Sequence, residues 1–392
     1  MAGSLNYNRP MPMQWVENRY RSSVLGCVIS SILLLTKHLD VALPAGDVIG
    51  WGRNESGQSS APGWLNNAVA VSSGGADGFG HSIALRKNGT VVAWGHGSFG
   101  QTNIPSGLQD IVAISAGGAH NLALNSKGEV IAWGDNFFGQ ADVPAGLSNV
   151  VSVAAGAAHS MALTAQGEVV VWGMNNYGQT NVPAGLSNVV AIAAGSFHCL
   201  ALKSNDSLVV WGYSSFGLTT VPSGLSNIVA IAAGGNQCMV LHSNGVVMNW
   251  GSSVPPPVGL SNVKGIGAGL GHCIALKTDG AVVSWGGNNH GAQNPPVGLS
   301  NIVAIAAGRD QQLVVSAKPS IDSIELDNQD VKIGFHSFSG RNYAIEYSTN
   351  MGTVGWSNLA GGVFSGNGYD IAVTDTNALS NSAKRFYRLR ID

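Results

Sequence analysis

The chain has 392 residues and a formal net charge of −2, and charged residues make up 10 % of it, against about 25 % in ordinary soluble domains. A chain so poor in charge lacks the basic surface that nucleic-acid binding requires. Its hydrophobic content of 45 % also excludes a wholly disordered chain.

The first 45 residues have the order of an export leader. Arg19 and Arg21 precede a largely apolar run of 12 residues, Val24 to Leu35, as in secretory signals. The run is too short to cross a bilayer, which takes about 20 residues. We therefore expect residues 1–45 to be a leader, with a buried helix as the alternative. The mature chain is then secreted, periplasmic or at the cell surface, and has no integral membrane span.

A repeat organises residues 46–317. The dipeptide Trp-Gly recurs at spacings of 43, 39, 39, 39, 39 and 35 residues, at Trp51, Trp94, Trp133, Trp172, Trp211, Trp250 and Trp285. A turn of small residues followed by His or Gln keeps step with it, at His81, His120, His159, His198, Gln237, His272 and Gln311. Seven copies of each signal predict seven units.

Each unit predicts four short antiparallel strands. In the second unit these are IVAISAG, NLAL, VIAWG and a short outer strand, QADVP, whose Pro suits a sheet edge. Radial repetition of such sheets gives a seven-bladed β-propeller, with a linear solenoid as the alternative. The strand at Val48 to Trp51 has no partner before it, and Gln312 to Val315 has none after it. Pairing these two would close the ring and remove two exposed edges.

Residues 318–392 predict a second, smaller module. Runs such as VKIGF, YAIEYST, DIAVTD and RFYRLRI alternate like half-buried strands and are punctuated by glycines. We expect a small β-sandwich, whose stretch from Phe335 to Tyr343 and whose Trp356 resemble modules at the C-termini of secreted bacterial proteins. Arg385, Arg388 and Arg390 form a basic edge or, alternatively, occupy ordinary solvated positions.

The pattern VIAWGDNFFGQADVPAGLSNVVSVAAGAAHSMAL resembles repeats of the regulator-of-chromosome-condensation type. The short period and the Gln-x-x-Val-Pro-Ala segment look most like bacterial seven-bladed members such as β-lactamase inhibitor protein II. That resemblance implies a propeller and, in such an inhibitor, loops on one face that hold the target enzyme. It does not fix a function, because one fold hosts many.

The repeated Trp and His residues predict structural roles. Each Trp should fill the wedge between two blades. The recurrent His should be hydrogen-bonded at a blade rim, and Gln237 and Gln311, which would be poor bases, argue against a catalytic ring. His198-Cys199 and His272-Cys273 are adjacent pairs whose side chains point to opposite faces of a strand. We therefore predict no catalytic residue, no metal site and no cofactor.

Aromatic residues supply the candidate binding site. Strand parity places the Trp-Gly loops and the His turns on one face of the ring. Four consecutive blades carry an aromatic residue five positions after Trp, and others lie nearby. The candidate residues are Phe99, Phe137, Phe138, Tyr177, Phe197, Tyr213 and Phe216. They either anchor a protein partner or cap their own loops.

We therefore predict an exported, non-catalytic propeller that binds an unidentified protein on this face. A first alternative is guanine-nucleotide exchange, as in eukaryotic relatives with longer repeats. Inhibition of a secreted enzyme such as a β-lactamase and glycan binding are the others. The segment 46–317 holds 8 basic and 11 acidic residues, so neither DNA wrapping nor strong electrostatic steering is expected.

Overall fold

The computed structural model describes the propeller almost completely and the C-terminal module in part. It describes residues 45–76, 79–252, 254–317, 321–327, 330–337, 342–348, 356–359, 363–366, 370–376, 378 and 385–391. The leader expected over residues 1–45 lies outside them apart from its last residue, and stays a prediction. Within these ranges, no helix is both long and apolar enough to span a membrane.

The repeating unit is a three-stranded antiparallel sheet. In the second unit β5 (Ile111–Ala116) pairs with β6 (His120–Asn125), and β6 pairs with β7 (Val130–Gly134). The middle strand is covered on both faces by neighbouring blades, so almost every residue of it is buried. This double burial explains why Leu122, Ala123 and Leu124 are all apolar rather than alternating with polar residues.

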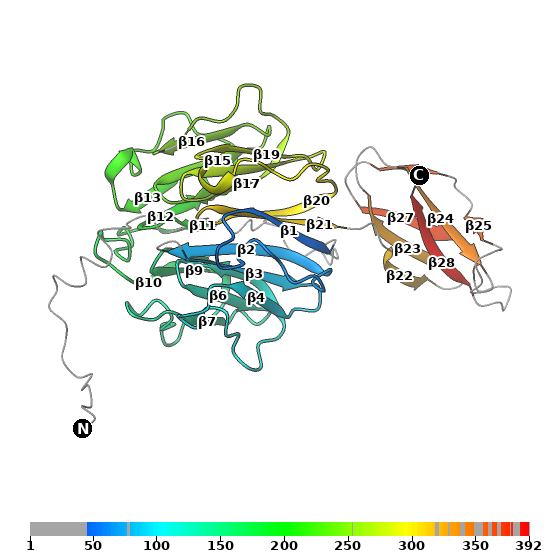
Figure 1. The fold of residues 1–392 in the computed structure, drawn as a ribbon, viewed down its shortest axis with the longest axis horizontal. Coiled ribbons are helices and arrows are strands. Elements are labelled where there is room, and N and C mark those ends of the chain that lie inside the picture. The colour runs from blue at the N-terminus through cyan, green and yellow to red at the C-terminus, as the bar shows by residue number, and fades with distance from the viewer. Residues whose placement is uncertain are drawn as a thin grey trace.

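The same arrangement recurs around the ring (Figure 1). The other continuous units are β2 (Ala68–Ala76), β3 (Phe79–Arg86) and β4 (Val91–Gly95); β8 (Val150–Ala155), β9 (His159–Thr164) and β10 (Val169–Gly173); β11 (Val189–Ala194), β12 (His198–Lys203) and β13 (Leu208–Gly212); β14 (Ile228–Ala233), β15 (Gln237–His242) and β16 (Val247–Gly251); and β17 (Val263–Ala268), β18 (His272–Lys277) and β19 (Val282–Gly286). The expected all-β propeller is therefore confirmed.

The two ends of the array complete a unit together. β20 (Ile302–Ala307) pairs with β21 (Gln311–Ala317), and β21 pairs with β1 (Gly46–Gly52) from the start of the array. The register runs without a break from Gly46 opposite Ala317 to Gly52 opposite Gln311. The Gln311 amide donates to Ser73 Oγ at 2.8 Å, across the junction with the first unit. The ring is closed, as the unpaired strands at its two ends predicted, and the linear solenoid is excluded.

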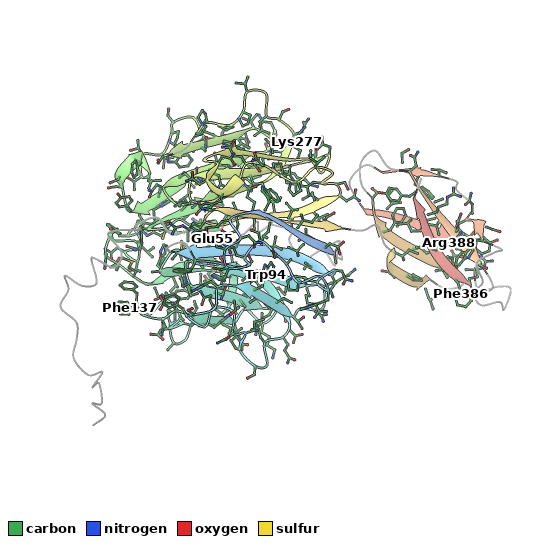
Figure 2. The ribbon with its side chains drawn as sticks, viewed as in Figure 1. Glu55, Trp94, Phe137, Lys277, Phe386 and Arg388 are labelled. Atoms are coloured by element: carbon green, nitrogen blue, oxygen red, sulfur yellow. The ribbon has the colours of Figure 1, made fainter. Side chains whose placement is uncertain are left out.

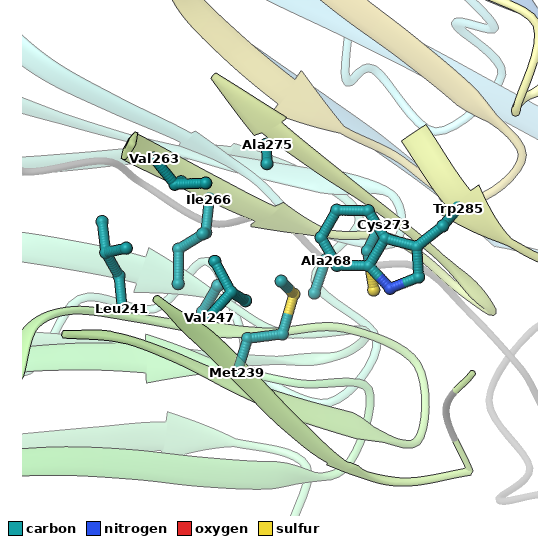
Figure 3. Close-up of a cluster of buried hydrophobic side chains, with 10 residues drawn as sticks. Met239, Leu241, Val247, Val263, Ile266, Ala268, Cys273, Ala275 and Trp285 are labelled. Carbon is teal, nitrogen blue, oxygen red and sulfur yellow. The ribbon is translucent and has the colours of Figure 1, made fainter. Parts of the chain in front are cut away.

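Large side chains fill the wedges between units. In the cluster of Figure 3, Met239 of β15 and Val247 of β16 pack against Ile266 and Trp285 of the next unit. Trp285 makes a contact that recurs in every unit. Each Trp of the repeat donates its indole N–H to a backbone carbonyl in the loop that comes from the preceding unit of the ring. The accepting residues are Ala292, Gln58, Gln101, Gln140, Gln179, Leu218 and Val254. The predicted wedge role of the Trp residues is confirmed.

The predicted fourth strand is wrong. In the second unit the QADVP segment forms turns, and the side chain of Asn136 organises it: Asn136 Oδ1 accepts the Ala141 N–H at 2.8 Å, and its amide donates to Asp142 at 2.6 Å. Pro144 offers no N–H to a sheet edge. Local side-chain hydrogen bonds thus replace a ladder.

The C-terminal module has two sheets around one core. One sheet holds β22 (Ile321–Asp327), β23 (Asp330–His336) and β27 (Asp370–Asp375). The other holds β24 (Asn342–Ser348), β25 (Ser357–Asn358), β26 (Phe364–Ser365) and β28 (Phe386–Ile391). Ile333, Phe335 and Tyr343 are buried between them. The expected boundary at residues 317/318 falls beside residues 318–320, outside the described residues, and stays a prediction.

The three arginines expected at a basic edge of this module are each paired with a carboxylate. Arg385 donates to the buried carboxylate of Asp375 at 2.7 Å. Arg388 and Arg390 share Glu346, at 2.7 and 3.1 Å. The strand pairing places each arginine beside a carboxylate, and three arginines against two carboxylates leave one excess positive charge.

Candidate protein-binding face

Strand pairing brings the Trp-Gly loops and the His turns to one end of the ring, which we call the loop face. Gly134 of the Trp-Gly dipeptide pairs with His120, and Gly173 pairs with His159. The chain enters and leaves the ring at the opposite end, the base, where Gly46 lies beside Ala317. The C-terminal module is therefore attached at the base, and its described residues do not cover the loop face (Figure 1).

A belt of buried histidines ties neighbouring blades together beneath the loop face. Its members are His81, His120, His159, His198 and His272. His81 Nε2 lies 2.8 Å from Asn121 Oδ1, and His120 Nε2 lies 2.9 Å from Ser160 Oγ, each in the next blade. The preceding glycine makes room for the ring, since a Cβ at Gly117 would lie 2.4 Å from His120 Cε1. This is the structural role that the repeat predicted.

Burial keeps these histidines neutral. Desolvation lowers the pKa of His120 and of His159 to about 3, and that of His81, His198 and His272 to about 4. A buried imidazole with such a pKa, closed off from solvent, has no access to a substrate. The belt stabilises the ring and does not form a catalytic site.

The cysteines of the repeats are buried as well. Cys199, Cys238 and Cys273 are free thiols, and burial raises the pKa of each, to about 12 for Cys273. Cys199 Sγ lies 3.3 Å from His159 Nε2. Cys199 thus occupies the position in its blade that Ser160, the partner of His120, occupies in the preceding blade. In the described part of the chain, no three His, Cys, Asp or Glu side chains converge as metal ligands.

The aromatic candidates fall into an exposed and a supporting set. Phe99, Phe137, Tyr177 and Phe216 are exposed on loops of four consecutive blades, with Phe137 and Phe216 at 63 % and 58 % of full exposure. Figure 2 shows Phe137 at the end of the propeller that lies away from the C-terminal module. Large aromatic side chains that are exposed together on one face are typical of interaction surfaces.

The remaining candidates lie beneath these rings. Phe138 packs with buried Phe197 and with Tyr213 in one small cluster. The Tyr177 ring lies 5.2 Å from Phe197 and 5.0 Å from Tyr213 between centroids. These residues therefore cap and support the loops, whereas partner binding by the exposed residues stays a prediction.

Sequence reasoning missed one aromatic group. Phe79 is exposed and stacks on His96 at 4.4 Å between centroids, and His96 lies 6.0 Å from Phe99. The signal was present, because the first Trp-Gly spacing is 43 rather than 39 residues. The extra residues carry Phe79 up to the loop face, so the exposed aromatic surface extends further around the ring.

A charged cluster on the loop face, at the seam between the last and first units, was also missed. Arg53 lies 3.7 Å from Asp310 and also pairs with Glu55, which lies 3.9 Å from His290. Arg309 lies 3.4 Å from Asp310. The first and last units meet here only after closure, so no local pattern could reveal it. The face is thus divided into an aromatic side and a charged side.

The fold and this face define a class: a closed propeller of short repeats whose loops gather at one end. Five of its units match the family model described as Regulator of chromosome condensation (RCC1) repeat, over residues 68–101, 111–140, 150–179, 189–218 and 263–292. These five units are therefore RCC1-type repeats, and they lie in a closed propeller that a C-terminal β-sandwich follows.

Solved structures agree on the fold. Human WBSCR16 is similar at 22 % identity and a TM-score of 0.56, over 69 % of this chain and 100 % of that one. Prp20p from Saccharomyces cerevisiae, whose structure was described with its binding to Gsp1p and histones, is similar at 19 % identity and a TM-score of 0.55, over 77 % and 94 %. The CRINKLY ectodomain of the Arabidopsis thaliana receptor kinase ACR4 is similar at 24 % identity and a TM-score of 0.50, over 62 % and 88 %. No curated protein matches the chain.

Proposed function

We propose that this chain is a non-catalytic protein-binding propeller whose partner docks on the aromatic side of the loop face. The observation that carries the proposal is the exposure of Phe79, Phe99, Phe137, Tyr177 and Phe216 along one side of a rigid ring. Partner surfaces that bury such rings gain most of their binding energy from them. The buried histidines and thiols supply no competing chemistry.

The support beneath the rings favours binding over loop capping alone. Tyr177 rests on Phe197 and Tyr213, so its position is set before any partner arrives. Phe137 meets Phe138 edge to face at 4.9 Å. Side chains held in place lose less conformational entropy on binding, which raises affinity.

The decisive experiment compares capture by two matched variants. Phe137→Ser with Tyr177→Ser removes exposed apolar groups from the loop face. Val258→Ser with Val297→Ser removes two fully exposed valines from loops that lead into β17 and β20 at the base. We expect the base variant to capture the same protein as the unaltered chain, and the loop-face variant to lose it.

The nature of the captured protein separates the alternatives. Faster nucleotide release from a captured GTPase would favour exchange, the activity expected of eukaryotic relatives. Inhibition of a captured secreted hydrolase would favour the inhibitor, and retention on a polysaccharide would favour glycan binding. Equal capture by both variants would contradict docking on the aromatic side. The leader expected over residues 1–45 adds export to the proposal, and fractionation of the producing cell tests it.

A further inference from the structure

Among the described residues, the core of the C-terminal sandwich is exposed along one edge. Among the described strands, β22 pairs only with β23, and β28 pairs only with β24. Ile324 lies opposite Ile333 in the β22–β23 ladder, and Leu326 lies opposite Val331. Residues directly opposite in a ladder project to the same face. Ile333 and Val331 are buried, whereas Ile324 and Leu326 are 54 % and 70 % exposed.

A cavity of about 360 Å³ lies at this edge, lined by Ile324, Trp356, Arg385, Phe386 and Tyr387. Its polar groups already have partners: Tyr387 Oη donates to Asp375 at 2.7 Å, and Arg385 donates to the same carboxylate. The Tyr347 ring lies 4.8 Å from the Arg385 guanidinium. The cavity is therefore an apolar and aromatic recess with a fixed rim and no uncompensated charge in its lining.

We propose that this edge binds an extended peptide of another protein, which adds as a strand beside β22 and places alternate apolar side chains in the cavity. A sheet edge offers backbone groups to such a strand, and side-chain recesses at alternate positions select its sequence. The exposed pair Ile324 and Leu326 has the two-residue spacing that this recognition uses.

Charge selects the kind of peptide. The sequence of β22 carries Asp322, Glu325 and Asp327 and no basic residue, and Glu325 lies opposite Lys332 of β23. Like charges directly opposite each other on paired strands are destabilising, so the β22 edge of a second copy is a poor partner. A strand that alternates apolar residues with lysine or arginine is complementary to it.

The site lies far from the aromatic rings. Figure 2 shows Phe386 and Arg388 at one end of the molecule and Phe137 at the other. A peptide at β22 therefore leaves the loop face free, and the chain can connect two partners. The inference does not depend on the function proposed for the loop face.

Fluorescence anisotropy of the full chain tests the proposal with a defined probe. The probe is a fluorescein-labelled decapeptide in which valine alternates with lysine or threonine. The control peptide has the same side chains but N-methyl groups on alternate amides, which block strand pairing. Ile324→Asp places a charge in the recess. Val363→Asp is the matched control, because Val363 is similarly exposed on the same module but does not line the cavity.

The proposal predicts saturable binding of the unmethylated peptide that weakens about tenfold in Ile324→Asp, the loss expected for one aliphatic contact. Val363→Asp and Phe137→Ser should bind as the unaltered chain does. No saturable binding, equal binding of the methylated peptide, or equal loss in Val363→Asp would overturn it. Loss in Phe137→Ser would move the peptide to the loop face and would also overturn it.

Discussion

Acidification is expected to unfold the propeller through its histidine belt. The five histidines have folded-state pKa values of about 3 to 4, whereas an unfolded histidine titrates near 6.5. Between these values the unfolded chain binds protons that the folded ring does not, so stability is complete above about pH 7 and falls as the pH decreases.

The size of the effect follows from the number of histidines. Each costs about 0.8 kcal/mol of stability at pH 6 and about 2 kcal/mol at pH 5, so all five cost about 4 and about 10 kcal/mol. A typical domain is stable by about 5–15 kcal/mol. The ring should therefore lose its fold near pH 5, a window that lies above the range where most carboxyl groups titrate.

Thermal melts followed by circular dichroism between pH 7.5 and 4.5 measure this loss. The repeat itself supplies the test variant, because Gln already replaces His at 237 and 311. His120→Gln with His159→Gln should reduce the pH dependence by about two fifths. The control is His242→Gln, which makes the same substitution outside the belt, at the hairpin turn of β15 and β16. A melting temperature that stays constant between pH 7 and 5 would refute the reasoning.

Three further predictions concern closure, backbone strain and the thiols. Deleting residues 46–52 removes β1 and Trp51 from the seam, so the melting temperature should fall by at least about 10 °C; an unchanged value would exclude closure as a source of stability. Phe216 is exposed and has a φ of 61°, in the left-handed region that glycine adopts without strain. Phe216→Gly should therefore raise stability by about 1 kcal/mol, measured by urea denaturation, whereas Phe99→Gly should lower it; a loss in both would contradict this. In a Cys27→Ser chain, Cys199, Cys238 and Cys273 should resist Ellman's reagent until guanidinium is added, because they are buried with raised pKa values; reaction of the folded chain would show that the blades open.

The sequence is most informative where the repeat enforces one environment. Trp133 and His120 recur because each wedge needs one large ring and each blade junction needs one buried hydrogen-bonding group. These local demands made the propeller, its closure and the common face of the loops predictable. The QADVP segment was expected to be a strand because its Pro suits a sheet edge, but Ala, Asp and Pro are rare in strands. The hydrogen bonds of Asn136 determine its turn.

The loop face was predictable only in part. The aromatic residues after Trp were found by their spacing. The spacing does not tell which of them are exposed: Phe137 is exposed, whereas Phe138 packs against Phe197. The pairing of Arg53 with Asp310 depends on contact between the two ends of the array. Such contacts exist only in the closed ring, and one-dimensional patterns do not contain them.

Hydrogen–deuterium exchange on the complex with the captured protein is the most direct test of docking on the aromatic side. The account predicts slower exchange on binding in the loops that carry the exposed rings, at residues 96–103, 135–142, 174–181 and 213–220. The base loops at residues 257–262 and 296–301 should exchange at the same rate in the free and bound chain. Protection confined to the base loops, or to the C-terminal module, would contradict it.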